Sequence, residues 1–391
     1  MDRLFVLSSA GLLLLVSVLA AGGPTRRWMG RQWTGLLACA VATVGTWLLV
    51  EPVAARWLPD NQKSFHLWSR SSQFIFRPIP EIMPGISGES RFTVNSLGIR
   101  GPELPERSVA YRILCVGGST TECLYLDDAE SWPHLLAARL NESRPEKPVW
   151  VGNIGRSGFS TPHHLKFIQE SPLIEEIDCV MLLVGYNDLS RLLCGELGHQ
   201  LWADDREKQP LWRHSNMLAM LRAIRQDWME GCVIIEDESG RNYELRRRER
   251  QQGPFSDAMP DATATLAEYR QRLEAIAKTC REKKVRVVFV TQPTIWADGL
   301  SSDIEALMWG GQLATGQYLK GGKIREGLDN YNKVLEGTCT EWGVECVSLG
   351  SMNDKTEWFY DHAHFNEAGA RAVARLVSDH FLNETKHELS N

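Results

Sequence analysis

The sequence predicts an α/β fold, namely a three-layer α/β/α sandwich built on a mainly parallel sheet. Short apolar runs typical of buried parallel strands alternate with helix-like segments along the chain. Four short blocks rich in glycine and polar residues close these runs or follow them closely, and such sheets bind ligands at the carboxyl ends of their strands. The 391 residues are 43% hydrophobic and 24% charged, which is typical of globular proteins.

The expected strands and helices alternate along the chain from residue 112 onward. The strands are expected at 112–116, 179–184, 285–290 and 344–349, and the helices at 131–140, 261–284, 324–342 and 366–377. The strands are short and apolar, whereas the helix at 261–284 repeats Leu266, Tyr269 and Leu273 at helical spacing. Strands that alternate with helices favour crossover connections and a parallel sheet.

The first block is Gly117-Gly118-Ser119-Thr120, directly after the strand at 112–116. A serine in such a strand-to-helix turn projects from the sheet edge, where backbone N–H groups can face an anion. Ser119 is therefore a candidate nucleophile. Alone, this block would be interpreted as a turn whose hydroxyl groups cap a helix, but the other blocks favour the nucleophile.

The last block, 361–364, can supply the base that a serine needs and the acid that orients this base. Asp361 and His364 are three residues apart, so their side chains can share one face of a turn, and His362 should point elsewhere. His362 is the alternative base, although it would need another orienting acid. Two histidines and an aspartate could also bind zinc, but no other Cys/His pair has ligand-like spacing, so no metal is expected.

The two middle blocks can stabilise the negative charge that develops on a carbonyl oxygen during acyl transfer. Asn187 follows the strand at 179–184 and can offer its side-chain amide. Gly158 offers a backbone N–H that no side chain would shield, and the N–H of Ser119 would complete this oxyanion hole. Each residue alone could be an ordinary turn residue. Their common order around strand ends favours the oxyanion hole.

These residues, in this order, resemble the SGNH/GDSL hydrolase superfamily over residues 111–382. The resemblance implies a flavodoxin-like fold. It also implies that Ser119 is the nucleophile, Gly158 and Asn187 are oxyanion donors, His364 is the base and Asp361 is its orienting acid. One departure is Gly118, which replaces the aspartate that often precedes the nucleophile, and this departure bears on the substrate class more than on the chemistry.

The N-terminal residues 1–50 are expected to form a membrane anchor with two transmembrane helices. The runs 4–21 and 34–50 carry no charge, and each approaches the length that crosses a bilayer. Arginines within 26–31 place the loop between the runs in the cytoplasm, so the domain that follows is expected outside it. The alternative is a signal peptide cleaved near residue 21, which would leave the domain in the cytoplasm.

Residues 51–108 are expected to be a linker and an N-terminal arm that leads into the hydrolase domain at 109–391. This stretch is rich in Pro, Gly, Trp and Phe, and its segment 92–102 is typical of an extended arm that packs on the domain. Resembling proteins often carry an Asn-Ser-x-Gly-x-Arg-Gly segment ahead of the first strand, found here at 95–101. That resemblance favours a packed structural role.

Insertions at about 189–260 and 297–323 are expected to shape the substrate pocket, and either could be a lid. The first contains an amphipathic helix around 212–229, expected to pack in a core, and a polar stretch around 232–245 that indicates a hairpin. The second contains Trp309 in a glycine-rich loop, which suits sugar stacking and plain packing equally well.

Charge and cysteine content exclude little beyond nucleic acid. A net charge of −6 gives no reason to expect nucleic acid, and the basic cluster 246–250 is expected to be a solvated loop because acidic residues lie nearby. Cys339 and Cys346 could form a disulfide or remain free thiols. No cofactor is expected, and no protein partner is indicated.

The sequence therefore predicts a membrane-anchored serine ester hydrolase of the esterase or deacetylase type, with the catalytic domain outside the cytoplasm. Its acyl-enzyme would form on Ser119, and its substrate would be an acylated small molecule or carbohydrate. The principal alternative is an O-acyltransferase of an envelope or exported polysaccharide that uses the same site. The second alternative is a catalytically silent glycan-binding or scaffold module, although such a module has no physical need to keep the whole catalytic set.

Overall fold

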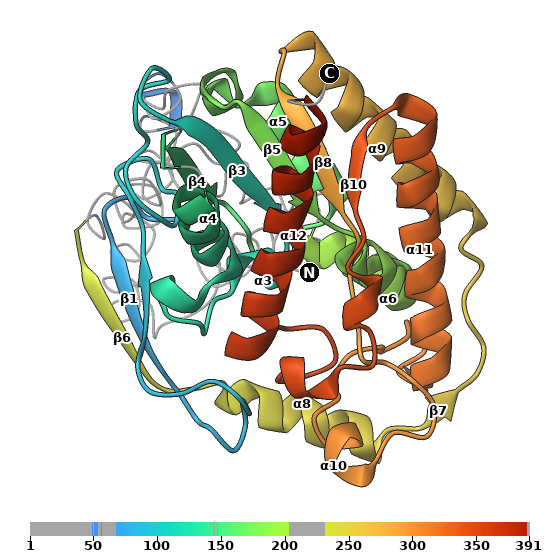
Figure 1. Ribbon diagram of the computed structural model, residues 1–391. Helices are drawn as coiled ribbons and strands as arrows, with labels where there is room; N and C mark the ends of the chain where they lie inside the picture. Colours follow the sequence, from blue (N-terminus) through green and yellow to red (C-terminus); the bar gives the residue numbers. More distant parts are fainter. Residues whose placement is uncertain are drawn as a thin grey trace, which may run out of the picture. The chain divides into compact units, whose positions relative to one another are not determined.

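A five-stranded parallel sheet is the centre of the computed structural model (Figure 1). Its strands are β3 (Tyr111–Gly117), β4 (Val149–Asn153), β5 (Cys179–Leu183), β8 (Arg286–Val290) and β10 (Glu345–Val347). They lie in the order β10-β8-β5-β3-β4, and each neighbouring pair is parallel. This is the doubly wound order of flavodoxin-like sheets, so the predicted α/β fold with a mainly parallel sheet is confirmed.

The structure describes residues 49, 51–53, 56, 68–143, 145–146, 148–202 and 231–388, and the elements below belong to one compact unit. The predicted segments 4–21 and 212–229, and nearly all of 34–50, lie outside these residues. Within the described ranges, no helix is both long enough and apolar enough to cross a bilayer.

Helices cover both faces of the sheet and complete three layers. Helices α4 (Trp132–Ser143) and α12 (Glu367–Glu388) pack against each other on one face, while α9 (Thr263–Glu282) packs between α5 (Thr161–Glu170) and α11 (Gly321–Trp342) on the other (Figure 1). All of β5 is buried, as expected for an apolar strand covered on both faces. Helix α9 buries Tyr269, Leu273 and Ile276, so its predicted helical spacing marks the face that packs.

Other elements surround this sandwich. Further helices are α3 (Ser119–Glu122), α6 (Tyr186–Trp202), α8 (Arg241–Gln252) and α10 (Ser302–Glu305), with 3-10 turns at Asp128–Glu130, Pro172–Glu176, Gly350–Met352 and Thr356–Trp358. A second sheet has the order β2 (Ser90–Thr93), β1 (Gln73–Pro78), β6 (Val233–Ser239), and β7 (Phe255–Ser256) pairs with β9 (Tyr318–Leu319).

The N-terminal arm lies against the edge of the main sheet. Arg100 and Asn153 exchange two backbone hydrogen bonds of 3.0 Å, one in each direction, just where β4 ends. Val94 and Ile99 of the arm are buried. The segment 92–102 is thus an integral part of the domain surface.

The predicted hairpin at 232–245 is wrong. Strand β6 pairs in parallel with β1, and the chain then enters helix α8 after Gly240 instead of returning as a second strand. The partner strand is distant in sequence, so no local pattern reveals it. The residues after Gly240 are mostly Arg, Glu, Gln and Leu, which favour a helix.

The cysteines of the described residues are all free thiols. Cys115 and Cys179 are buried in strands of the sheet, where they pack as small apolar side chains. The thiols of Cys339 and Cys346, for which the sequence leaves both states open, lie within hydrogen-bond reach of each other.

Candidate active site

The nucleophile block forms a tight turn between β3 and α3. A Cβ atom on Gly117 would lie 2.2 Å from Thr121 Oγ1 and 2.8 Å from the carbonyl oxygen of Leu183. A Cβ atom on Gly118 would lie 2.4 Å from Asn187 Nδ2. The two glycines therefore let the turn approach the end of β5 and the Asn187 amide, and Ser119 becomes the first residue of α3.

Ser119, His364 and Asp361 form a continuous hydrogen-bonded chain. His364 Nε2 lies 2.7 Å from Ser119 Oγ, and His364 Nδ1 lies 2.7 Å from Asp361 Oδ2. Asp361 is fully buried and His364 is 7% exposed. In the tautomer that fits this network, Nδ1–H donates to the carboxylate and Nε2 accepts from the serine hydroxyl.

The Asp361 carboxylate is held in its ionised form. Burial alone would raise its pKa, but electrostatic interactions with the His364 and His362 rings and hydrogen bonds from the His364 ring and the Ala363 N–H lower the pKa below its ordinary value. The Asp361 Oδ1 atom accepts the backbone N–H groups of Ala363 and His364 at 2.9 and 2.8 Å. These bonds close the loop that presents the histidine ring.

His362 points away from the nucleophile, as its position between Asp361 and His364 predicted. Its ring centre lies 5.0 Å from that of Trp296, 5.2 Å from that of Tyr186 and 4.8 Å from that of Trp309. Neither of its ring nitrogens has a hydrogen-bond partner among the described residues. Burial lowers the pKa of His362 to about 3, so this histidine is neutral and the geometry favours His364 as the base.

Nothing in the described part of the chain is arranged as a metal site, since no three His, Cys, Asp or Glu side chains gather there to hold an ion. Asp361 faces His364 and Trp309, and His362 turns into aromatic side chains.

The predicted oxyanion donors lie around the nucleophile turn. Asn187 follows β5, and its Nδ2 donates to the carbonyl oxygen of Phe159 at 2.7 Å beside Gly118. Gly158 sits in a turn at φ 80°, a conformation that favours glycine. Within the described residues, no hydrogen bond is made by the backbone N–H of Ser119 or of Gly158. These two N–H groups and the second N–H of the amide remain available to a ligand.

Glu122 joins the nucleophile helix to the Gly158 loop, a role that sequence reasoning missed. The buried carboxylate accepts hydrogen bonds from the Ser157 backbone N–H, at 3.0 Å, and from the Ser157 hydroxyl. A Cβ on Gly155 would lie 2.2 Å from the Glu122 nitrogen, so the loop lies directly on α3. Burial raises the pKa of Glu122, although its bonds to Ser157 act in the opposite direction. The only sequence signal was an acidic residue one turn after the serine.

Trp309 contacts both members of the Asp–His pair. Its indole Nε1 donates to Asp361 Oδ2 at 2.7 Å, and its ring is nearly parallel to that of His364, with 6.1 Å between centres and 13° between planes. The guanidinium of Arg246 lies 4.8 Å from the indole centre. The sequence left sugar stacking and packing open for this loop, and the structure shows packing against Asp361 and His364.

The basic cluster at 246–250 is not a solvated loop, because it belongs to helix α8 and two of its arginines are buried. Arg247 donates to the carbonyl oxygens of Leu307 and Tyr360, both at 3.1 Å. Arg250 donates to those of Gly310 and Leu319, at 2.7 and 3.0 Å. The charge pattern could not reveal these roles, since the partners are backbone carbonyls. Helix α8 thereby holds the Trp309 loop and the Asp361 loop together.

Known proteins resemble this chain in both sequence and fold. Residues 115–304 match the family of GDSL-like lipases and acylhydrolases. None of the curated proteins matches the chain.

Several solved structures are similar to part of this chain. An α/β hydrolase from the metagenome of Lake Arreo is 14% identical, with a TM-score of 0.40, covering 71% of this chain and 96% of its own. An acetylxylan esterase from Geobacillus stearothermophilus is 13% identical, with a TM-score of 0.40, and the match covers 69% of this chain and 94% of the esterase. A putative lipolytic protein of the G-D-S-L family from Desulfitobacterium hafniense is 10% identical, with a TM-score of 0.37 and coverage of 68% and 98%. Together with the sequence blocks, the family match means that residues 115–304 form part of a GDSL-like hydrolase domain of the SGNH/GDSL superfamily, whose members act on ester bonds.

Proposed function

We propose that the protein is a serine esterase in which Ser119 is the nucleophile, His364 is the general base and Asp361 orients His364. The observation that carries this proposal is the pair of 2.7 Å contacts that link Ser119 Oγ to His364 Nε2 and His364 Nδ1 to Asp361. A serine hydroxyl is a weak nucleophile until a base within hydrogen-bond reach removes its proton, and this arrangement supplies that base.

The reaction would run in two halves through an acyl-enzyme. In the first half, Ser119 Oγ attacks the ester carbonyl carbon while its proton moves to His364 Nε2, which then protonates the departing alcohol. In the second half, His364 removes a proton from water as the water attacks the acyl carbon. The carboxylic acid leaves, and the proton on His364 returns to Ser119.

The oxyanion that forms in each half would be held by three donors. These are the backbone N–H groups of Ser119 and Gly158 and the amide of Asn187, which gather at the carboxyl ends of β3, β4 and β5. Fixed donors of this kind stabilise the transition state more than the substrate, because the charge appears only there.

The substrate class and location are further parts of the proposal. The uncharged runs 4–21 and 34–50, with arginines between them, support a membrane-anchored enzyme whose catalytic domain lies outside the cytoplasm. An O-acylated carbohydrate fits that location. The half-buried indole of Trp309 beside His364 supports this class, because sugar rings stack on aromatic faces.

The test is hydrolysis of 4-nitrophenyl acetate and longer-chain esters by the full-length chain beside Ser119→Ala. We expect turnover that disappears in the variant while its unfolding temperature is unchanged. Turnover that persists in Ser119→Ala would refute the proposed nucleophile. Acyl release to water, measured with and without sugar acceptors, then separates hydrolysis from acyl transfer. A folded protein that neither turns over esters nor reacts with a fluorophosphonate at Ser119 would be the silent module instead.

A further inference from the structure

The helix that carries the nucleophile cannot hold its own position. Helix α3 is a single turn, and Cys123, the residue that ends it, adopts a left-handed conformation at φ 51°. An isolated helical turn is unstable in water, because its few hydrogen bonds do not offset the loss of backbone freedom. The position of Ser119 must therefore be imposed by the residues around this turn.

Side chains from three other elements bind the carbonyl oxygens of this turn. Trp132 Nε1 donates to Thr120 at 3.0 Å, Asn153 Nδ2 donates to Thr121 at 2.7 Å, and Arg100 Nη1 donates to Glu122 and Cys123 at 2.8 and 2.9 Å. All the carbonyl groups that a one-turn helix leaves unpaired after its first residue are thus satisfied by side chains.

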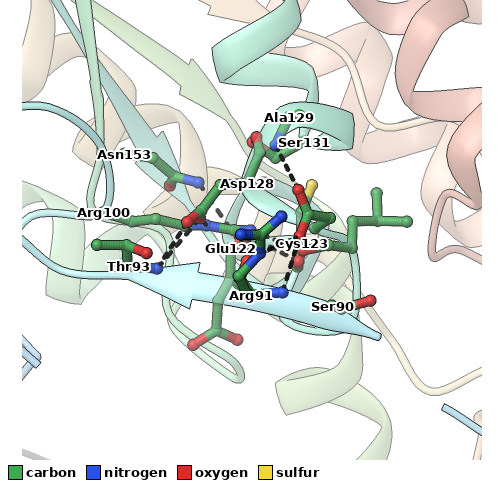
Figure 2. Close-up of polar contacts among 12 residues, drawn as sticks. Ser90, Arg91, Thr93, Arg100, Glu122, Cys123, Asp128, Ala129, Ser131 and Asn153 are labelled. Atoms are coloured by element: carbon green, nitrogen blue, oxygen red, sulfur yellow. Dashed lines mark hydrogen bonds and ion pairs between the residues drawn. The ribbon is translucent and has the colours of Figure 1, made fainter. Parts of the chain in front are cut away.

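Arg100 makes the largest contribution to this arrangement, as Figure 2 shows for its contacts with Glu122, Cys123 and Asp128. Its Nη2 also donates to the carbonyl oxygen of Leu126 at 2.7 Å, and only 3% of the residue is exposed. A guanidinium offers five donors in a rigid plane, so one side chain can fix several carbonyl groups at once.

Arg100 is itself held on both sides. Its Nε donates to Asp128 Oδ1 at 2.9 Å, and the Asp128 carboxylate also accepts the backbone N–H of Thr93 (Figure 2). The ring of Phe92 lies 4.2 Å from the guanidinium carbon. A buried charge needs an opposite charge and hydrogen-bond partners. Here Asp128 and Phe92 also fix the direction in which the guanidinium points.

The backbone of Arg100 also contacts the end of β4, from which the loop to Gly158 begins. It exchanges two hydrogen bonds with the backbone of Asn153, whose side chain binds the nucleophile turn and whose Oδ1 accepts the N–H of Gly155. One residue of the arm is therefore connected both to the turn of Ser119 and to the loop that leads to Gly158.

We propose that Arg100 is a positioning residue of the active site, which holds Ser119 and the start of the oxyanion loop in register. This inference rests on the proposed function and adds to it a residue outside the 115–304 segment that matches the family. Arg100 does not touch the reacting atoms. It acts through the carbonyl groups of α3, so its loss should impair turnover more than substrate binding.

The test compares Arg100→Lys with Arg112→Lys in the full-length chain. Arg112 is the matched control, because it is equally buried and pairs with Glu176 and Asp178, but it lies at the opposite end of β3 from the nucleophile. Both substitutions should lower the unfolding temperature. Only Arg100→Lys should lower kcat, by about 10- to 100-fold with little change in KM, as small displacements of reacting groups do. In the Arg100→Lys variant, Ser119 should also react with a fluorophosphonate more slowly, by a similar factor.

A second variant keeps the proposal testable if Arg100→Lys does not fold. Asp128→Asn removes the charge that directs Arg100 but leaves its carbonyl contacts, and we expect about a fivefold loss of kcat. Normal kcat and labelling in folded Arg100→Lys, or in Asp128→Asn when the former is unfolded, would overturn the positioning role. An equal kcat loss in Arg112→Lys would also overturn it. These outcomes differ from failure of the proposed function. In that case the Ser119→Ala variant would keep the ester turnover of the unmodified chain.

Discussion

Trp309 donates its indole N–H to the same oxygen of Asp361 that accepts the hydrogen bond from His364 Nδ1. The other carboxylate oxygen accepts two backbone N–H groups of the loop itself. Each oxygen thus accepts two hydrogen bonds, and only the indole comes from outside the loop, from a residue 52 positions earlier in the chain. The Asp361 carboxylate is therefore held partly by a residue of the predicted 297–323 insertion.

Replacing Trp309 by phenylalanine should lower kcat about tenfold, because one hydrogen bond to a buried charge is lost while the ring remains. Ester turnover and the unfolding temperature of the variant would be measured together. Trp342→Phe is the control, since Trp342 ends α11 and contacts Arg281 rather than the catalytic residues. Equal kcat values in Trp309→Phe and the unmodified protein would show that the indole hydrogen bond is dispensable.

Gly118→Ala should reduce kcat by about 100-fold, the usual effect of losing one oxyanion donor. The new Cβ would lie 2.4 Å from Asn187 Nδ2 and would displace the amide, so the aspartate common in the family should be no better tolerated here. Gly337→Ala is a suitable control, because its Cβ would meet no atom within 4 Å and helix α11 should gain stability of about 1 kcal/mol. Full activity in Gly118→Ala would contradict the role of Asn187.

Glu122→Gln should lower kcat/KM about fivefold at pH 8, because a neutral amide binds Ser157 more weakly than a carboxylate does. Burial raises the pKa of Glu122, so the unmodified carboxyl takes up its proton at a higher pH than an exposed glutamate. The activity ratio of unmodified protein to variant should therefore shrink as pH falls from 8 to 5. Glu130→Gln, which alters a surface ion pair with Arg371, should give a constant ratio. A constant ratio for Glu122→Gln as well would show that the negative charge of Glu122 does not contribute to activity.

Buried His362 and His164 should make stability depend on pH. Burial lowers the pKa of each to about 3, from an ordinary value of 6.5. Between these values the unfolded chain binds more protons than the folded one, so the free energy of unfolding falls as pH decreases from 6.5 towards 3. Each histidine should cost about 2 kcal/mol between pH 6.5 and pH 5.

Urea unfolding at several pH values checks this prediction, with His362→Leu and His164→Leu each expected to lower the slope by the contribution of one histidine. Asp188, whose pKa burial raises to about 6, contributes a slope of opposite sign that both variants keep. The comparison uses the slope with pH, because either substitution could also shift stability at every pH. A slope that both variants leave untouched would assign the pH dependence to other groups.

The sequence predicted the sheet, and it selected the candidate site residues, because each lies in a continuous local pattern. Apolar runs mark the strands, and Ser119, Asn187 and the Asp361 loop follow strand ends that topology brings together. Ser119, His364 and Asp361 do meet in the structure, and Gly118, next to Ser119, approaches Asn187 and the carbonyl oxygen of Phe159, the residue after Gly158.

The supporting residues could not be predicted in the same way. Arg100, Arg247 and Arg250 bind backbone carbonyl groups, which any sequence can provide, so no complementary side chain marks their partners. Strand β6 was misassigned for a related reason, since its partner β1 lies far away in the chain and contributes no local signal. What sequence patterns miss here is long-range support rather than chemistry.

The pairing of β1 with β6 has a consequence for the order in which the protein folds. Arg77 of β1 and Asp237 of β6 form an ion pair, although they are 160 residues apart. Contacts between such distant residues form slowly, because a long loop must close before they contribute stability. Strand β2, which leads to Arg100, is hydrogen-bonded to β1 as well, so the three-stranded sheet that precedes Arg100 is complete only once this loop has closed. Esterase activity, which is proposed to depend on Arg100, should accordingly return late in refolding, after most of the helices have formed.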